Sequence, residues 1–169
     1  VEGYHSSAVM ATKTDGTLWA WGVGWDGKLA HNNETNYSSP IQVGTDTTWS
    51  TDIVKLAGGI DSAAAIKTDG TLWIWGENTR GELGQNNVTS YSSPVQVGTD
   101  TTWKKVSWGY KNVYTIKTDG TLWSWGYNQN YGQLGHNNRT HYSSPVQIPG
   151  TWDAGVGVGY DAFGLRPAG

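Results

Sequence analysis

The 169-residue sequence contains no cysteine, one Phe, one Met and few charged residues. Without cysteine it has neither disulfides nor a thiolate metal site, which fits an extracellular protein and a cytosolic one equally well. No apolar run approaches the roughly 18 residues of a membrane-spanning helix, so we expect no membrane insertion. Charged residues make up 15 % of the chain, and no basic cluster exists beyond Lys104 and Lys105. We therefore expect no nucleic-acid partner held through its phosphates.

Tryptophan, tyrosine and glycine, in contrast, are plentiful, with 11, 9 and 24 copies. This composition favours many short strands and tight turns over helices. An aromatic content of 12 % is also too high for a disordered polar chain.

Nearly the same phrase occurs three times, as "KTDGTLWAWG" from Lys13, "KTDGTLWIWG" from Lys67 and "KTDGTLWSWG" from Lys117. "YSSPIQVGTDTTW" likewise returns as "YSSPVQVGTDTTW" and, shortened, as "YSSPVQIPGTW". A period of about fifty residues predicts tandem copies of one structural unit. The predicted organisation is a single repeat domain at 1–169, with repeats at approximately 4–59, 60–109 and 110–159 and a partial repeat at 160–169.

Every local signal within a unit is that of β structure. "AAAIKT-DG-TLWIW" predicts two strands joined by a two-residue Asp-Gly turn of type I′, in which both central residues have positive φ. "SPVQV" predicts a third strand, and "WKKVSWG" predicts the fourth strand of repeat 60–109. Four short strands in tandem units predict an all-β fold, a β-propeller built of four-stranded antiparallel blades. We expect three full blades plus partial terminal strands.

The Trp pairs lie in strands that are apolar on both faces. In "TLWIW", Trp73 and Trp75 share one face of the strand, and Leu72 and Ile74 share the other. Such a strand is expected between two neighbouring blades. We therefore predict inter-blade packing, rather than a row of exposed sugar platforms, for Trp19, Trp21, Trp73, Trp75, Trp123 and Trp125.

The repeated Asp-Gly pairs resemble catalytic or calcium-binding acids only at first sight. No second acid stands at a ligand-like spacing, and no facing carboxylate pair, nucleophile motif or zinc-site histidine spacing is present. Asp followed by Gly in a hairpin is typical of a turn. We predict no catalytic residue, no metal and no cofactor, and structural turns at Asp15, Gly16, Asp69, Gly70, Asp119 and Gly120.

Three polar loops, "NNETNYSS", "NNVTSYSS" and "NNRTHYSS", mix the residue types that adaptable binding surfaces favour. They also contain glycosylation sequons at Asn33, Asn36, Asn87 and Asn138. Two interpretations are open: solvated connections, or an arc of contacts around one rim for a multivalent glycan or protein partner. The candidate binding residues are Asn33, Asn87, Asn138, Tyr37, Tyr91 and Tyr142.

Three further aromatic residues break the repeat pattern. Trp25, Tyr127 and Tyr131 lie in the loop that follows the Trp pair, where the second repeat has Glu77, Thr79 and Arg80. Because the repeat gives them no packing role, we predict that they are contact anchors for a partner.

Segments 72–84, "LWIWGENTRGELG", and 122–135, "LWSWGYNQNYGQLG", resemble the repeat of the regulator of chromosome condensation superfamily. The Gly109-Tyr110 pair, the Asp-Gly turn and the later prolines match as well. The resemblance covers essentially the whole chain and implies propeller blades, usually seven in a ring. The first repeat departs from the pattern, with Gly24 in place of Asn78 and Ala30 in place of Gly84, and the third carries one additional residue in "YNQNYG".

The resemblance implies a fold and no single function. Some members of the superfamily promote guanine-nucleotide exchange and bind chromatin, some inhibit β-lactamases, and many repeats occur in bacterial and phage surface proteins. The Thr, Asn and Ser content without cysteine is similar in style to the prokaryotic or phage repeats. This chain is too weakly basic for nucleosome binding.

Three blades do not close a ring, for which about four to eight are typical. We expect the sequence, which starts at Val1 without a signal-like segment, to be part of a longer chain or to associate in copies. The expected function is a non-enzymatic structural scaffold or protein–protein interaction module in an extracellular, cell-surface or virion-associated assembly. Its partner is a protein, or further copies or blades. The alternative is a lectin-like or receptor-binding adhesin that uses the Asn/Thr/Tyr-rich loops to bind glycans.

Overall fold

A computed structural model of the chain describes residues 8–129 and 131–152, together with the backbone of two short strands at 156–158 and 163–165. Two 3-10 helices, η1 (Trp25–Gly27) and η2 (Ile53–Lys55), accompany the strands. The strands are β1 (Ala8–Thr12), β2 (Leu18–Gly22), β3 (Tyr37–Gln42), β4 (Leu56–Gly58), β5 (Ser62–Ile66), β6 (Leu72–Gly76), β7 (Tyr91–Gln96), β8 (Trp103–Trp108), β9 (Asn112–Lys117), β10 (Leu122–Gly126), β11 (Tyr142–Ile148), β12 (Val156–Val158) and β13 (Phe163–Leu165).

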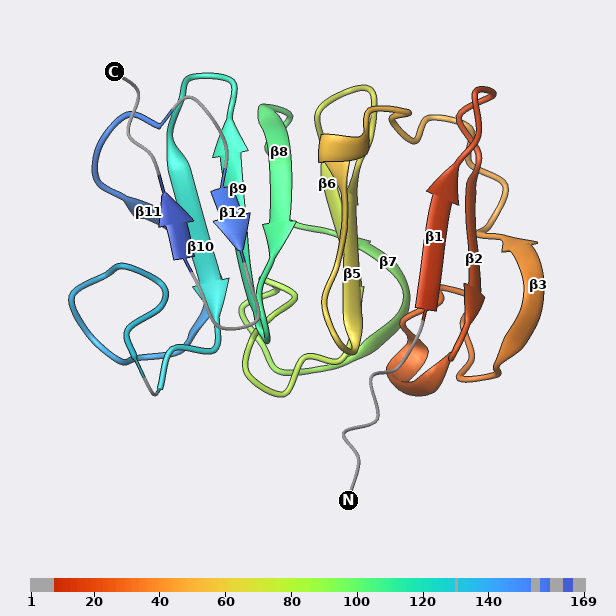
Figure 1. The fold of residues 1–169 in the computed structure, drawn as a ribbon, viewed down its shortest axis with the longest axis horizontal. Helices are drawn as coiled ribbons and strands as arrows, with labels where there is room; N and C mark the ends of the chain where they lie inside the picture. Colours follow the sequence, from red (N-terminus) through yellow and green to blue (C-terminus); the bar gives the residue numbers. More distant parts are fainter. Residues whose placement is uncertain (1–7, 130, 153–155, 159–162, 166–169) are drawn as a thin grey trace.

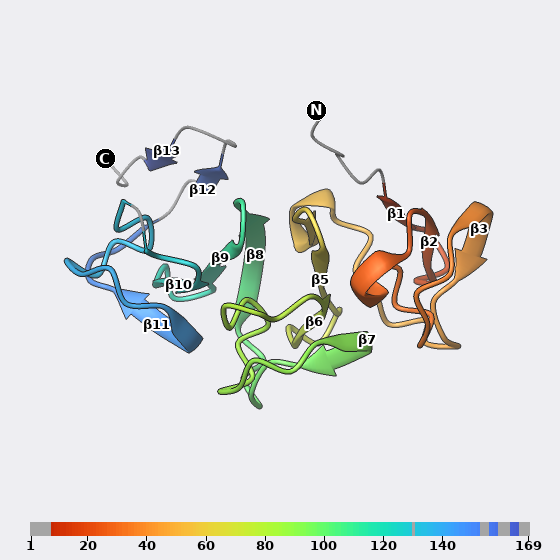
Figure 2. The same ribbon diagram turned by 90° about the horizontal axis from the view of Figure 1, so that it is seen from below.

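These strands form antiparallel sheets that follow one another along an arc. The second and third blades are four-stranded, in the orders β4-β5-β6-β7 and β8-β9-β10-β11, and the first has the order β1-β2-β3 in the described residues. Figure 2 shows the outer strands β3, β7 and β11 on the convex side of the arc, with β8 and β12 on the concave side. The predicted all-β fold of antiparallel blades is confirmed.

The blades begin one strand earlier than the sequence-based grouping. We assigned "WKKVSWG" to the end of repeat 60–109, but β8 pairs with β9 and is the innermost strand of the third blade. The preceding β4 pairs with β5 in the same way. A tandem repeat fixes the period of the units but not the point at which a sheet begins, which is why this grouping was wrong.

The predicted partial repeat at 160–169 lies largely outside the described residues. Its described part is β13, which pairs antiparallel with β12. The first residues of repeat 4–59, before Ala8, also lie outside the described residues.

The Asp-Gly hairpins use a longer turn than the sequence suggested. In the first hairpin, Lys13 N–H donates to Thr17 O and Gly16 N–H donates to Lys13 O, so three residues form the loop. Only the glycine has positive φ, at 79° in Gly16, whereas the type I′ turn requires positive φ at the aspartate too. The aspartate instead accepts hydrogen bonds from the backbone and side chain of Thr17. The predicted type I′ turn is therefore wrong.

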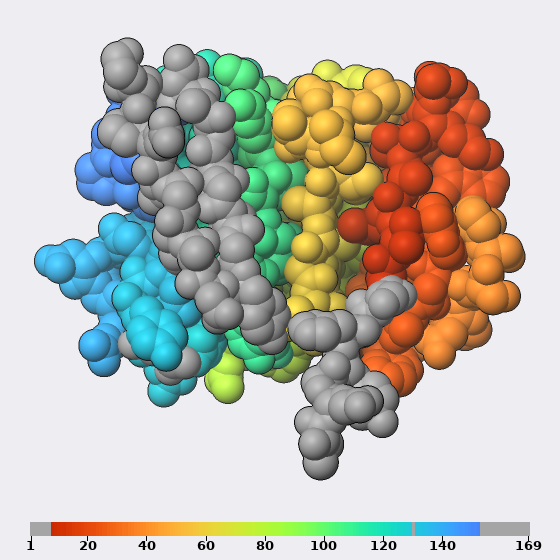
Figure 3. Space-filling view, viewed as in Figure 1, coloured from red at the N-terminus to blue at the C-terminus, as the bar shows by residue number. Residues whose placement is uncertain are grey.

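The blades pack through the two faces of their Trp-containing strands. Ala63, Ala65 and Trp75 of the second blade form a buried cluster with Leu18 and Ala20 of the first. The opposite face packs against the third blade, in a cluster that includes Ile66, Leu72, Ile74, Val113 and Trp125. Figure 3 shows the blades as adjoining bands in sequence order. The tryptophan faces of the second and third blades therefore contact the preceding blade, at the opposite strand face of that blade.

The arc has two rims, visible at the top and bottom of Figure 1. One rim carries the Asp-Gly turns, and we call it the Asp-Gly rim. The other carries the loops at 23–36 and 77–90 and the loop formed by 127–129 and 131–141, and we call it the long-loop rim.

Candidate functional site

The Asp-Gly rim repeats one arrangement of lysine, tryptophan and aspartate. Lys117 Nζ lies 4.1 Å from the centroid of the Trp123 ring and 4.5 Å from that of Trp103, and it pairs with Asp100. Hydrogen bonds from Lys117 and Thr102 lower the pKa of Asp100 to about 2. A lysine that is held against the rings leaves less aromatic surface open for a sugar.

The same arrangement occurs in the second blade. Lys67 Nζ lies 3.9 Å from the centroid of Trp73 and 4.9 Å from that of Trp49, and it pairs with Asp46. Partial burial raises the pKa of Asp46, but the hydrogen bonds from Lys67 and Thr48 outweigh it and lower the pKa to about 2. Because the second and third blades repeat this arrangement of lysine, tryptophan and aspartate, we interpret it as a structural part of the blade.

On the long-loop rim, a buried asparagine organises each of the second and third loops. The Asn128 side chain donates to Asn138 O and Thr140 O and accepts a hydrogen bond from the Leu134 backbone. Asn78 makes the corresponding bonds to Thr89 O and Leu83 N–H. The hydrogen bonds of these two side chains hold the loops in shape where no strand pairing does so.

The first loop closes differently because Gly24 occupies the position of the asparagine. A Cβ at Gly24 would lie 2.1 Å from Thr35 O, so the loop backbone fills the space of the missing side chain. Ala30 adopts the left-handed conformation (φ 62°) that Gly84 and Gly135 adopt in the other blades. The first repeat therefore keeps the left-handed turn despite its departures from the sequence pattern.

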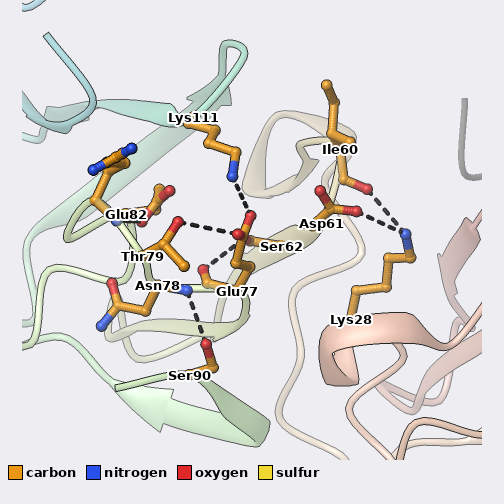
Figure 4. A network of polar contacts seen from close by, with 11 residues as sticks. Lys28, Ile60, Asp61, Ser62, Glu77, Asn78, Thr79, Glu82, Ser90 and Lys111 are labelled. Atoms are coloured by element: carbon orange, nitrogen blue, oxygen red, sulfur yellow. Dashed lines mark hydrogen bonds and ion pairs between the residues drawn. The ribbon is translucent and has the colours of Figure 1, made fainter. Parts of the chain in front are cut away.

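Charged side chains cross both blade junctions on this rim, with opposite polarity (Figure 4). Between the first and second blades, Lys28 Nζ lies 3.2 Å from Asp61 Oδ1 and also donates to Ile60 O. Between the second and third blades, Lys111 of the later blade is the cation and Glu77 of the earlier one is the anion. The cation is therefore on the earlier blade at the first junction and on the later blade at the second.

Glu82 is the least satisfied member of the network. It stands where the first blade has Lys28, and its side chain is buried with Oε1 lacking a hydrogen-bond partner. Oε2 accepts the Arg80 N–H at 2.6 Å. Burial raises the pKa of the Glu82 carboxyl, and the nearby Lys111 offsets part of that rise.

The indole groups of two predicted packing residues connect neighbouring blades. Trp75 Nε1 donates to Lys28 O and Trp125 Nε1 donates to Glu82 O, both at 2.8 Å. Both indoles are completely buried, as a contact between blades requires. Trp21, at the same repeat position in the first blade, is half-buried.

The other three tryptophans of the pairs are only half-buried. The indoles of Trp19, Trp73 and Trp123 each donate to the threonine two residues earlier, which directly precedes the strand. Trp73 and Trp123 pack against the clusters that join their blade to the preceding one.

An aromatic patch lies on the long-loop rim of the third blade. We define it as Tyr110, Tyr127 and His141. The Tyr127 ring stacks on His141 with centroids 5.0 Å apart, and Tyr110 meets Tyr127 edge-on at 6.2 Å. The three residues come from separate segments, and Tyr110 is 43 % exposed. The second repeat has no aromatic residue at these positions, and the first has none at the positions of Tyr127 and His141.

The predicted anchors are only partly brought together. Tyr127 belongs to the aromatic patch, and Tyr131 is 85 % exposed on the same loop. Trp25 is 50 % exposed in η1 of the first blade, two blades away.

The tyrosines of the polar loops, by contrast, close their own loops. Tyr142 OH accepts a hydrogen bond from Asn138 Nδ2, which also donates to His136 O. The Asn138 Oδ1 accepts the Thr140 N–H, so the whole amide is engaged. The other two loops repeat these bonds, through Asn33 and Tyr37 and through Asn87 and Tyr91. The predicted arc of free contacts stays a prediction.

A groove of about 560 Å³ lies on the outer surface between the first two blades. Trp49, Trp73, Tyr37 and Pro94 give it apolar walls, and His31 adds a polar edge. Within the described residues, no group of three or more His, Cys, Asp or Glu side chains is placed to hold a metal ion.

Sequence reasoning missed two residues of the aromatic patch. The histidine spacing predicts no zinc site, and Tyr110 belongs to the repeat pattern, so neither residue is indicated by a motif. Alignment of the three repeats contains a signal for His141, because Asn36 and Ser90 replace it in the other units.

Comparison with known proteins places the repeat in a family. Family models described as the regulator of chromosome condensation (RCC1) repeat match residues 15–66, 69–116 and 119–154, and 53–82 in a second version. Each of the three main matches starts at the aspartate of an Asp-Gly hairpin.

Similar sequences include the X-linked retinitis pigmentosa GTPase regulator of Canis lupus familiaris, 31 % identical over 99 residues, and the human E3 ubiquitin-protein ligase HERC2, 32 % identical over 95 residues. These alignments cover 59 % and 56 % of this chain, but only 10 % and 2 % of the relatives. The chain therefore corresponds to a small part of each.

Solved structures share the fold. Human WBSCR16 superposes with a TM-score of 0.78 at 19 % identity, over 96 % of this chain and 42 % of that one. Prp20p of Saccharomyces cerevisiae gives 0.69 at 18 % identity, over 87 % and 39 %. The predicted β-propeller blades are thereby confirmed, and since the family models match most of the sequence, this chain belongs to the RCC1 repeat family.

Proposed function

We propose that the chain is a non-enzymatic β-propeller module that binds a protein partner through the aromatic patch on its long-loop rim. The single observation that carries the proposal is the assembly of Tyr110, Tyr127 and His141 from separate segments of one blade. Tyrosine is enriched in binding hot spots, which cluster near the centre of an interface. The stacked pair of Tyr127 and His141 has no counterpart in the other two repeats, so the packing that all blades share does not account for it.

A solved protein with the same fold binds other proteins. Yeast Prp20p binds Gsp1p and histones, and Kap60 binds it as well. These partners belong to that protein, and they support only the class of function that we propose here.

Addition of a partner strand at the convex edge is the less favourable mode of binding. Pro40, Pro94 and Pro145 lie in the outer strands β3, β7 and β11. Proline has no N–H to donate, so it interrupts the ladder that an added strand needs. A partner is therefore better accommodated at a rim, through side chains.

The proposal is tested with a tagged chain used as bait in lysates of cells that produce it. Tyr127→Ser is compared with the wild type and with Trp25→Ser, a control that removes an aromatic ring from the same rim of the first blade. We expect a captured partner to survive Trp25→Ser and to fall roughly tenfold or more with Tyr127→Ser, as for a hot spot. Equal capture by both variants, with folding verified by circular dichroism, contradicts the proposal.

The alternative function is that of a lectin-like adhesin. The groove between the first two blades supports it, because Tyr37, Trp49 and Trp73 line it together with polar loop residues. Against it, Lys67 already lies over Trp73 and Trp49. Binding on a glycan array that is lost with Tyr37→Ala, and retained with Tyr127→Ser, would favour the adhesin over the protein-binding module.

The setting of the molecule is also a proposal. An extracellular, cell-surface or virion-associated location is suggested by the Thr, Asn and Ser content and the absence of cysteine. The low basic content supports the proposed absence of a nucleic-acid partner. Further blades or copies that complete a ring are the other proposed partners.

A further inference from the structure

One backbone N–H on the long-loop rim is capped in all three blades, each time by a different side chain. Gly24 N–H donates to Asn36 Oδ1 at 2.8 Å, and Asn78 N–H donates to Ser90 Oγ at 3.1 Å. In the third blade, Asn128 N–H donates to His141 Nδ1 at 3.0 Å. Asparagine and serine do not titrate between pH 4 and 8, whereas histidine does. The third blade alone has a cap whose hydrogen-bonding capacity depends on pH.

The capped residue holds the loop together. Asn128 is completely buried, and its side chain joins both ends of the loop through Asn138 O, Thr140 O and the Leu134 N–H. The His141 ring itself stacks on Tyr127. A change at the cap is therefore transmitted to the loop and to the aromatic patch.

We infer that His141 is a pH-sensitive latch that joins Asn128 to the end of the loop segment 131–141, closed when the ring is neutral and released when the ring is protonated. In the closed state Nδ1 accepts a hydrogen bond, so the neutral ring carries its proton on Nε2. Protonation places a second N–H against the Asn128 N–H and removes the acceptor. Two donors then face each other, and the loop must move or lose the bond.

The surroundings of His141 oppose protonation. Burial lowers the pKa of His141, and the positive charge of Arg80, from the loop of the second blade, lowers it further. The other groups that face the ring are Tyr127, which stacks on it, and Tyr110, which meets Tyr127 edge-on. No acid of the described residues hydrogen-bonds to the ring, so release is expected below the ordinary histidine value of 6.5.

The latch is tested by NMR on the whole chain labelled with ¹⁵N, between pH 7.5 and 4.5. We expect amide exchange at Asn128, corrected for the intrinsic effect of pH, to rise roughly tenfold or more as His141 titrates. The equivalent amides of Asn78 and Gly24 are internal controls and should change little. Parallel behaviour of Asn128 and Asn78 over the whole range overturns the inference.

Two variants separate a latch from a general response to acid. His141→Asn copies the cap of the first blade, and it should keep Asn128 protected at every pH. His141→Ala removes the cap, and it should give at pH 7.5 the fast exchange that the wild type shows at pH 4.5. An acid transition that persists in His141→Asn overturns the inference.

If the latch opens in acid, a partner bound at the aromatic patch is expected to dissociate; this second expectation rests on the proposed function as well. The exchange experiment measures the loop alone, so it distinguishes the two failures. A latch that works without any Tyr127-dependent partner contradicts only the proposed function.

Discussion

The two rims of the arc are built from the same three repeats, yet they differ in how much they change from blade to blade. On the Asp-Gly rim, the lysine, tryptophan and aspartate of the second and third blades occupy the same positions and make the same contacts. On the long-loop rim, Lys28 becomes Glu82, and the cap changes from Asn36 to Ser90 to His141. The packing of neighbouring blades explains the residues that are identical from blade to blade. Each residue that differs has to be explained by the contacts of its own loop.

The largest expected effect tests the constant part of this comparison. Trp125→Ala removes a buried indole and its hydrogen bond to the preceding blade, and it should lower the free energy of unfolding by about 3–5 kcal/mol. Trp21→Ala, at the same repeat position, removes a half-buried ring and should cost about 1–2 kcal/mol. Urea denaturation measures both values. Equal losses of unfolding free energy in the two variants would show that the repeated tryptophan does not stabilise the chain through contact between blades.

A smaller effect is expected where two backbones touch across a junction. A Cβ at Gly81 would lie 2.5 Å from Ser143 Cα, in a residue with φ +83°. Gly81→Ala should therefore cost about 2–4 kcal/mol through strain and overpacking. Gly98 also has positive φ but open space around it, so Gly98→Ala should cost only about 1 kcal/mol. Similar thermal midpoints for the two variants would contradict a tight junction.

The smallest effect tests a residue that differs between the blades, and it has the opposite sign. Glu82→Gln replaces a buried carboxyl by the residue type of Gln133, which follows at the same repeat position. Because burial raises the pKa of Glu82, its stabilising contribution is complete below the unfolded value near 4.5 and is lost as pH rises through the folded pKa. The variant should gain about 1–2 kcal/mol at pH 7 and little at pH 4.

The control for this experiment is Glu77→Gln, which leaves Lys111 without its ion pair. It should destabilise the chain at pH 7, so the two substitutions are expected to act in opposite directions. A loss of stability in both variants would mean that Glu82 is ionised and paired at neutral pH.

Much of the fold could be predicted from the sequence because the repeats state it three times. The period, the hairpin at each Asp-Gly pair and the two-faced Trp strand all follow from residue types and spacing. The turn type could not be predicted, since the dipeptide Asp-Gly suits both a two-residue turn and the three-residue loop that Lys13 closes with Thr17. The assignment of strands to blades could not be predicted for a different reason. β8 pairs with β9, which follows it in the chain, and the repeat pattern does not show on which side a strand pairs.

The candidate site was predicted only in part. Tyr127 could be singled out because it interrupts the repeat, but its neighbours come from a different hairpin and from the far end of its own loop. The cap at His141 depends on Asn128, 13 residues earlier, and no local pattern relates the two. Contacts between distant segments of a loop require its folded shape, which the repeat alone does not supply.

The asparagine loops have a practical consequence for producing the protein. Asn33, Asn87 and Asn138 each use both amide hydrogens, one on a backbone carbonyl and one on a tyrosine hydroxyl. Attachment of a sugar at Nδ2 replaces one of these hydrogens, so a host that glycosylates secreted chains during synthesis would modify the loops before they close. Expression in a bacterial cytoplasm avoids this conflict and is the better choice for measuring the properties described above.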